Sequence, residues 1–210
     1  MALKGSQRHS GTVKMTILGV TGSPRKNSNT GELVKAVLKG AENLGAETVS
    51  WSVEGKTISG CTSCFSCLGS GVCAVKDGIQ ELYPLLKKAD GVVFGSPVYF
   101  WGISSQLKTV LDRMFCLWAL GAMKGKAGAG VVTTCTRGAT QALQTLTSFF
   151  IQLGMHPAGF ATGYCSSSET GSLAASKFSS DAIAPDDDPW AQAEACAHEI
   201  TDLLKRTGTP

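Results

Sequence analysis

The sequence lacks a hydrophobic run long enough to cross a membrane and lacks a strong excess of either charge. Its longest apolar candidate, residues 92–101, is broken by Gly95, Ser96 and Pro97, whereas a membrane-spanning helix needs about 20 consecutive apolar residues. Only 17% of the residues are charged and the net charge is +3, which argues against a nucleic-acid-binding surface. Residues 1–14 contain no apolar segment of a secretory signal. We therefore expect a cytoplasmic protein that binds neither membranes nor nucleic acid, with a small molecule as partner.

The composition also excludes a disordered chain, because 43% of the residues are hydrophobic. A length of 210 residues favours one ordinary domain with a substantial core over two domains. We expect a flexible N-terminal arm at 1–14 and a single domain at 15–206. A Ser-rich segment, 165–187, carries few large apolar residues, and a connection of this length is typical of a lid, an oligomer arm or a mobile segment.

Strand-like and helix-like patterns alternate along the chain. Short apolar or alternating runs predict strands at 15–20, 49–53, 91–95, 130–135 and 159–164. Apolar residues with helical spacing predict helices at 30–44, 79–86, 103–118 and 139–153, the second interrupted at Pro84. Asp188 and Pro189 predict the cap and first position of a last helix, which Gly208 can close. Five alternations of this kind predict an α/β fold, a parallel sheet with helices on both faces.

The segment between the first strand and the first helix, residues 21–30, is rich in hydroxyl and amide groups and contains two cations. A helix N-terminus offers free backbone N–H groups and a positive dipole end, which together suit a phosphate. Side chains that could add donors are Ser23, Arg25, Ser28, Asn29 and Thr30. The alternative is a well-capped helix, for which Ser28 or Asn29 alone would suffice. The number of donors favours the phosphate site.

A second segment, at the end of the third strand, sets three aromatic side chains beside a glycine. It consists of Pro97, Val98, Tyr99, Phe100, Trp101 and Gly102. Such a segment can form an apolar wall and supply backbone N–H groups to the heteroatoms of a planar ring. The alternative for each aromatic side chain is a place in the core or in a subunit contact.

These two segments together resemble the flavodoxin-like NAD(P)H-dependent FMN reductases. The resemblance rests on Gly22–Arg25 with Ser28–Thr30 and on Gly95–Gly102, extends to Lys108 and Asp112-Arg113, and covers residues 15–165. It implies a three-layer sandwich with a five-stranded parallel sheet in the order 2-1-3-4-5. It also implies FMN, with its phosphate on the loop after the first strand and its isoalloxazine ring against the loop after the third. NAD(P)H is then a candidate electron donor, and a homodimer or homotetramer is expected by analogy.

A third wall of the flavin pocket is expected from the loop after the fourth strand. The residues assigned to it are Thr134, Thr136, Arg137 and Gly138. Family members often carry glycines in this loop, and Cys135 and Arg137 stand in their place, so the sequence departs from the family pattern here.

Four of the eight cysteines crowd into one loop, 60–74, as a C-x2-C-x2-C-x5-C run of Cys61, Cys64, Cys67 and Cys73. Two-residue gaps let successive thiolates converge on one inorganic core, and Gly69 and Gly71 let the chain fold back. Four thiolates without a histidine suit a 4Fe-4S cluster or tetrahedral zinc, and free thiols are a further alternative. The compact run resembles the motif of the iron-sulfur flavoproteins, a branch of the same family, which favours the cluster.

Because the cysteine loop follows the second strand, which ends at the carboxyl edge of the sheet, we expect its four sulfurs to converge on the flavin side of the sheet, within the same subunit or across a subunit contact. The other four cysteines, Cys116, Cys135, Cys165 and Cys196, are expected to be small apolar fillers.

The favoured hypothesis is an FMN-dependent oxidoreductase or electron-transfer flavoprotein that also carries a 4Fe-4S cluster and exchanges electrons with small-molecule or protein donors and acceptors. We assign no catalytic acid or base, since the cofactor carries the difficult chemistry. The alternatives are a plain NAD(P)H-dependent FMN or quinone reductase without a cluster, an electron-carrier module that turns over no substrate, and a structural zinc protein.

Overall fold

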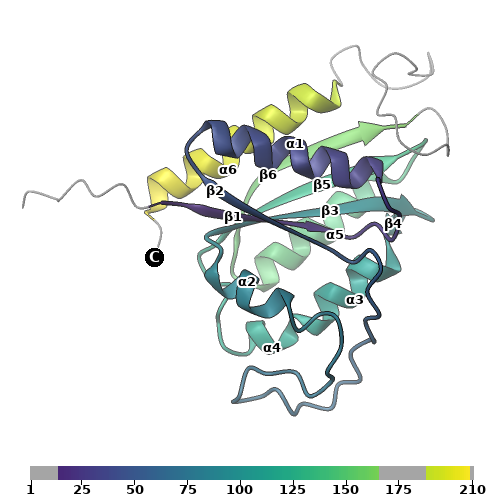
Figure 1. Ribbon diagram of the computed structural model, residues 1–210, viewed down its shortest axis with the longest axis vertical. Helices are drawn as coiled ribbons and strands as arrows, with labels where there is room; N and C mark the ends of the chain where they lie inside the picture. The colour runs from purple at the N-terminus through teal and green to yellow at the C-terminus, as the bar shows by residue number, and fades with distance from the viewer. Residues whose placement is uncertain (1–13, 166–187, 209–210) are drawn as a thin grey trace, which may run out of the picture.

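The computed structural model describes residues 14–165 and 188–208, which form an α/β sandwich (Figure 1). Its five parallel strands lie in the order β2-β1-β3-β5-β6. They are β1 (Thr16–Thr21), β2 (Glu47–Ser52), β3 (Gly91–Tyr99), β5 (Ala127–Thr134) and β6 (His156–Tyr164). The predicted sheet order, 2-1-3-4-5 when only parallel strands are numbered, is confirmed. The expected N-terminal arm, except Lys14, and the Ser-rich segment, except Cys165, lie outside the described residues.

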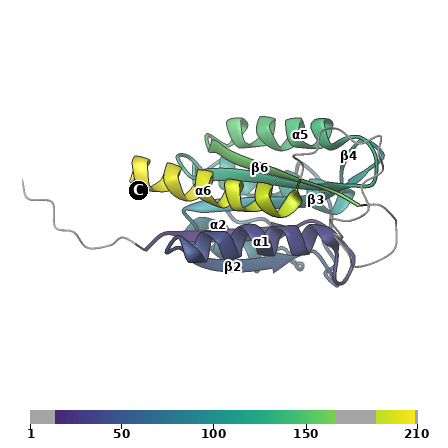
Figure 2. The same ribbon diagram turned by 90° about the horizontal axis from the view of Figure 1, so that it is seen from above.

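Helices cover both faces of the sheet. One face carries α1 (Asn29–Asn43) and α6 (Pro189–Thr207), which run alongside each other in Figure 2. The other face carries α2 (Leu82–Lys88), α3 (Ser105–Arg113), α4 (Phe115–Trp118) and α5 (Ala139–Gln152). Each face encloses its own apolar core, and every residue of β5 is buried between the two. A continuous apolar strand of this kind is expected in a parallel sheet with both faces covered.

Several helix boundaries follow the local signals in the sequence. The Ser28 side chain caps α1, and Asp188 caps α6 with Pro189 at its first position. Gly208 closes α6 with a φ of +66°. The predicted interruption of the second helix at Pro84 is wrong. Helix α2 begins at Leu82, so the proline lies in its first turn, where no N–H donor is required.

Two further elements differ from the sequence-based expectation. The strand expected at 91–95 continues to Tyr99, and a short strand β4 (Gly102–Ile103) pairs antiparallel with its end. The helix expected at 103–118 is two helices, α3 and α4, separated at Met114. Each helix in the described part of the chain is too short or too polar to span a bilayer.

Candidate functional site

Three loops meet at the carboxyl edge of the sheet. The Gly22 N–H donates to the Gly95 carbonyl at 2.7 Å, and the Ser104 hydroxyl donates to the Gly22 carbonyl at 2.6 Å. The hydroxyl oxygens of Thr30 and Thr133 lie 2.6 Å apart and are buried. The loop after β1 is therefore bonded to β3 and to the start of α3, and the first turn of α1 is bonded to β5, so the first predicted segment, 21–30, adjoins the other two.

Close contact at this edge depends on glycine at two positions. A Cβ atom on Gly22 would lie 2.5 Å from Leu107 Cβ. A Cβ on Gly138 would lie 2.8 Å from Val98 Cγ1 and 2.9 Å from Trp101 Cα, and Gly138 also has a φ of +94°. The loop after β5 therefore packs directly against the segment that follows β3, as a shared pocket requires.

Within the loop after β1, three of the predicted donors have partners in the chain. The Ser28 hydroxyl accepts from the Gly31 N–H at 3.0 Å, so this residue acts as the cap that the alternative interpretation required. The Ser23 hydroxyl is buried and accepts from the Arg25 N–H at 3.3 Å, and Thr30 pairs with Thr133. These side chains shape the loop, and a ligand would have to compete for them.

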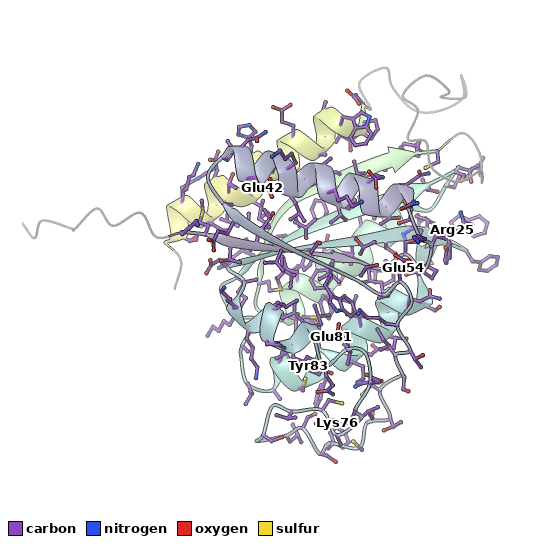
Figure 3. All side chains as sticks on the ribbon, viewed as in Figure 1. Arg25, Glu42, Glu54, Lys76, Glu81 and Tyr83 are labelled. Carbon is purple, nitrogen blue, oxygen red and sulfur yellow. The ribbon has the colours of Figure 1, made fainter. Side chains whose placement is uncertain are left out.

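Arg25 is the fourth predicted donor, and its side chain remains available. It is exposed and forms no ion pair with any residue in the described parts of the chain. Figure 3 shows it at the edge where the parallel strands end, next to the start of α1. A free guanidinium beside the first-turn N–H groups of a helix is a suitable arrangement for an anion.

Asn29 is the fifth predicted donor and faces a cysteine. Its Nδ2 donates to Cys165 Sγ at 2.8 Å. Its Oδ1 is buried and accepts no hydrogen bond from the described residues. Burial raises the pKa of the Cys165 thiol, more than the bond from Asn29 lowers it. A buried acceptor without a donor is costly in the absence of a ligand, so the site fits a molecule that brings its own donor groups.

The aromatic segment forms the tip of the β3–β4 hairpin. Tyr99 is 39% exposed, Phe100 94% and Trp101 53%, so a place in the core of this chain is wrong for all three. Tyr99 pairs with Gly102, which leaves Phe100 and Trp101 as the two residues of the turn. Their φ angles are +46° and +63°, values that Asn and Gly usually supply in such turns. Strain at exposed aromatic residues is typical of functional positions, and no signal in the sequence announced it.

The remaining residues of the hairpin and of the loop after β5 are held more tightly. Pro97 is level with Thr133 in the register of β3 and β5, and Val98 pairs with Ile103. The Thr134 hydroxyl donates to the Arg137 carbonyl at 2.9 Å and so organises its own loop.

The side chains of Thr136 and Arg137 are exposed at this edge of the sheet. Cys135 is exposed as well, so its prediction as an apolar filler is wrong. The other three predicted fillers, Cys116, Cys165 and Cys196, are buried.

The four clustered cysteines line one cavity of about 360 Å³, together with residues from the end of α3 and from α4. Burial raises the pKa of Cys67, and the neighbouring Cys73, Cys64 and Cys61 raise it further by charge repulsion. Hydrogen bonds from Ser66 lower the pKa of Cys64. In residues 14–165 and 188–208, no three His, Cys, Asp or Glu side chains are arranged to hold a metal ion. The thiols thus share a cavity but do not form a closed coordination shell.

The path of this loop depends on left-handed backbone conformations. Gly69 and Gly71 have φ angles of +83° and +63°, and Ser63 and Phe65 also have positive φ. A Cβ on Gly71 would lie 1.9 Å from Leu120 Cδ1, so another residue there would have to displace the Leu120 side chain as well as adopt a positive φ. The two glycines that were expected to turn the chain back adopt the conformations that this role requires.

The cysteine loop does not remain at the carboxyl edge as predicted. It leaves β2 from that edge, but its cavity is lined by Asp112, Arg113, Phe115 and Cys116. The loop after β1, in contrast, contacts Ser104 and Leu107. The two regions therefore lie at opposite ends of α3, a nine-residue helix that is about 13 Å long. In Figure 3, Lys76, two residues after the cysteine loop, is likewise far from Arg25.

Comparisons with known proteins were made against families, individual sequences and solved structures. Residues 15–166 match the family described as NADPH-dependent FMN reductase. An iron-sulfur flavoprotein of Archaeoglobus fulgidus is 34% identical over 151 residues, which cover 71% of this chain and 69% of that protein. One from Methanocaldococcus jannaschii is 35% identical over 139 residues, which cover 65% and 72%.

Solved structures agree in fold. The structure of RosB with a bound intermediate superposes with a TM-score of 0.69 at 15% identity, covering 92% of this chain and 81% of that one. An NAD(P)H:quinone oxidoreductase from Methanothermobacter marburgensis gives 0.61 at 13% identity, covering 90% and 98%. Identities this low establish only the flavodoxin-like fold, whereas the family match spans well over half of the chain. The protein therefore belongs to the NADPH-dependent FMN reductase family and is an oxidoreductase of the flavin-dependent kind that this family comprises.

Proposed function

We propose that the protein is an FMN-dependent oxidoreductase that also holds a 4Fe-4S cluster on Cys61, Cys64, Cys67 and Cys73. The observation that carries the cluster is the single cavity that all four thiols line. Thiolates are the usual ligands of iron-sulfur clusters, and no histidine lines this cavity. The relatives at about one-third identity that are named iron-sulfur flavoproteins support the same assignment.

The proposed flavin site has a charged part and an apolar part, and both lie at the carboxyl edge of the sheet. Arg25 and the first-turn N–H groups of α1 would hold the phosphate, and Asn29 Oδ1 would accept from a hydroxyl group of the ligand. The hairpin residues 97–102 and the loop residues 134–138 would enclose the ring. When bound, the flavin supplies the capacity to exchange a hydride or single electrons, and the protein orients it.

The chain's own residues would control access to that chemistry. Trp101 and Phe100 are exposed at the hairpin tip, so they can cover an apolar ring and exclude water from it. Gly138 lets the loop after β5 approach within contact distance of Trp101. We propose NAD(P)H as an electron donor, a small molecule or protein as the acceptor, and a homodimer or homotetramer as the assembly.

Purification under anaerobic conditions tests the proposed function. We expect flavin absorbance, broad iron-sulfur absorbance, and about four iron and four sulfide per chain. Cys64→Ser should remove the iron and leave the flavin. Cys135→Ser serves as the matched control for iron alone, since it replaces another exposed cysteine outside the cavity, and it should retain the iron. Flavin without iron would instead indicate a plain reductase, and zinc in place of iron would indicate a structural metal site.

A further inference from the structure

A buried arginine lies at the base of the cysteine loop. Arg113 is the last residue of α3, is 2% exposed and lines the thiol cavity. Arginine is seldom buried unless its donors are satisfied. The partners of its guanidinium group therefore indicate why the charge is kept in the interior.

Four of the five guanidinium N–H donors close the loop. Nη1 donates to the Ser59 carbonyl at 2.8 Å and to Asp77 Oδ2 at 2.9 Å. Nη2 donates to the Val75 carbonyl at 2.9 Å and to Asp77 Oδ1 at 3.3 Å. Ser59 is two residues before the first cysteine of the run, and Val75 is two residues after the last. One side chain thus ties the two ends of the loop together.

The fifth donor has no such partner. Arg113 Nε is buried and has no hydrogen-bond acceptor within the described residues. Arg113 belongs to the wall of the thiol cavity, whereas its ion-pair partner Asp77 does not. The cavity therefore borders the positive member of this pair, and the other charged residue of its wall, Asp112, is paired with Lys108. A metal centre held by four thiolates is anionic, and it would gain from a nearby donor and a permanent positive charge.

We propose that Arg113 is a positioning residue for the group bound by the four cysteines: its two terminal nitrogens hold the loop closed, and its charge lies beside the anionic centre. The identity of that centre rests on the proposed function. The closing of the loop does not, because it is formed by hydrogen bonds within the chain itself.

Two substitutions of Arg113 separate these roles. Arg113→Met removes the charge and all five donors, and Arg113→Lys keeps a charge but cannot form the fork of hydrogen bonds. Lys124→Met is the matched control, since Lys124 is an exposed cation that lies outside the cavity wall and forms no ion pair with the described residues. FMN affinity serves as the check on folding, because the flavin residues lie at the other end of α3.

The first measurement uses the full-length, reduced, metal-free protein. Amide hydrogen exchange across residues 59–77 should become faster in both Arg113 variants and remain unchanged in the control. Binding of Co²⁺ alone, followed by thiolate-to-metal absorbance, should weaken about 10- to 100-fold, the range typical of lost outer-shell partners.

The second measurement is the reduction potential of the anaerobically prepared protein, which should become more negative in Arg113→Met than in Arg113→Lys.

The proposal and the proposed function fail in different ways. If the unmodified protein contains no iron, the cluster assignment fails, while hydrogen exchange and Co²⁺ affinity still test Arg113. If folded Arg113→Met matches the Lys124→Met control in both of those measurements, the positioning role is wrong. If Arg113→Lys restores both the amide exchange rates and the Co²⁺ affinity of the unmodified protein, the role of the fork of hydrogen bonds is refuted.

Discussion

Arg25 offers the cleanest test of the phosphate site. Its side chain is exposed and forms no ion pair with the described residues, so Arg25→Ala removes little that stabilises the fold. Ser28 is a poorer target, although it was predicted to contact the phosphate as well. Its hydroxyl caps α1, and losing a cap of this kind costs about 1 kcal/mol of stability.

The expected magnitude follows from the type of bond. A hydrogen bond to a charged group contributes about 1.5–3 kcal/mol, which corresponds to about 10- to 150-fold in Kd. Arg25 is open to solvent, and solvent screening weakens exposed charge pairs. We therefore expect Arg25→Ala to weaken FMN binding about tenfold, the lower end of this range. Riboflavin has no phosphate and should bind both proteins with the same affinity.

Isothermal titration of the flavin-free protein with each ligand measures this difference. Lys26→Ala is the matched control, because Lys26 is the adjacent cation and is also exposed. It should retain the preference for FMN. If Arg25→Ala weakens FMN and riboflavin equally, or if the control loses as much affinity for FMN as Arg25→Ala does, Arg25 is not the phosphate ligand.

Three further predictions concern other parts of the molecule. Gly138→Ala should lower stability by about 1–3 kcal/mol in urea unfolding and weaken the flavin, because its φ is +94° and the new Cβ would lie 2.8 Å from Val98 Cγ1; unchanged stability would contradict this contact. Trp101→Gly should raise stability by about 1 kcal/mol by relieving a positive φ, yet weaken flavin binding; unimpaired binding would exclude Trp101 from the pocket. Asp77→Asn should cost about 3–5 kcal/mol by leaving Arg113 unpaired. Burial raises the pKa of Asp77, but hydrogen bonds from Arg113 and two backbone amides lower it more. The ionised form therefore stabilises the fold above the unfolded pKa of about 3.9, and this contribution is lost as the pH falls through the lower, folded pKa. Between pH 6 and pH 2, the Tm of the unmodified protein should therefore fall more steeply than the Tm of Asp77→Asn.

The sheet and its loops were predictable because their signals are local or periodic. Buried parallel strands appear as continuous apolar runs, and β5 is buried at every position. Capping residues such as Asp188 act through bonds to residues two or three positions away. The family resemblance supplied the strand order, which periodicity alone does not contain.

The hairpin at the end of β3 could not be predicted in this way. Aromatic residues rarely occupy positive φ, so Phe100 and Trp101 give no signal for a two-residue turn. Pro97 also argues against a strand, because it cannot donate to a neighbouring chain. The hairpin forms nevertheless, since tertiary contacts such as that between Gly138 and Trp101 outweigh the local preference.

The course of the cysteine loop depends on a contact between residues far apart in the sequence. Lys108 and Arg113 lie five positions apart on one helix and are both cations that a sequence pattern would place at the surface. Lys108 is exposed, as expected, but Arg113 is buried and binds residues 36 to 54 positions away. Its partners are two carbonyl groups, which every residue possesses, and Asp77. Nothing in the spacing of the cysteines identifies them.

Helix α3 consequently links the two regions of the molecule. Its N-terminal cap, Ser104, donates to the loop after β1, and its last residue, Arg113, closes the cysteine loop. Because an α-helix is stiff over nine residues, the loop after β1 and the thiol cavity of one chain remain at opposite ends of α3. A small adjustment of loops therefore cannot bring the cavity to the proposed flavin site of its own chain. If the flavin and the cluster bind as proposed, electrons that pass directly between them cross the length of this helix or pass between chains of the proposed oligomer.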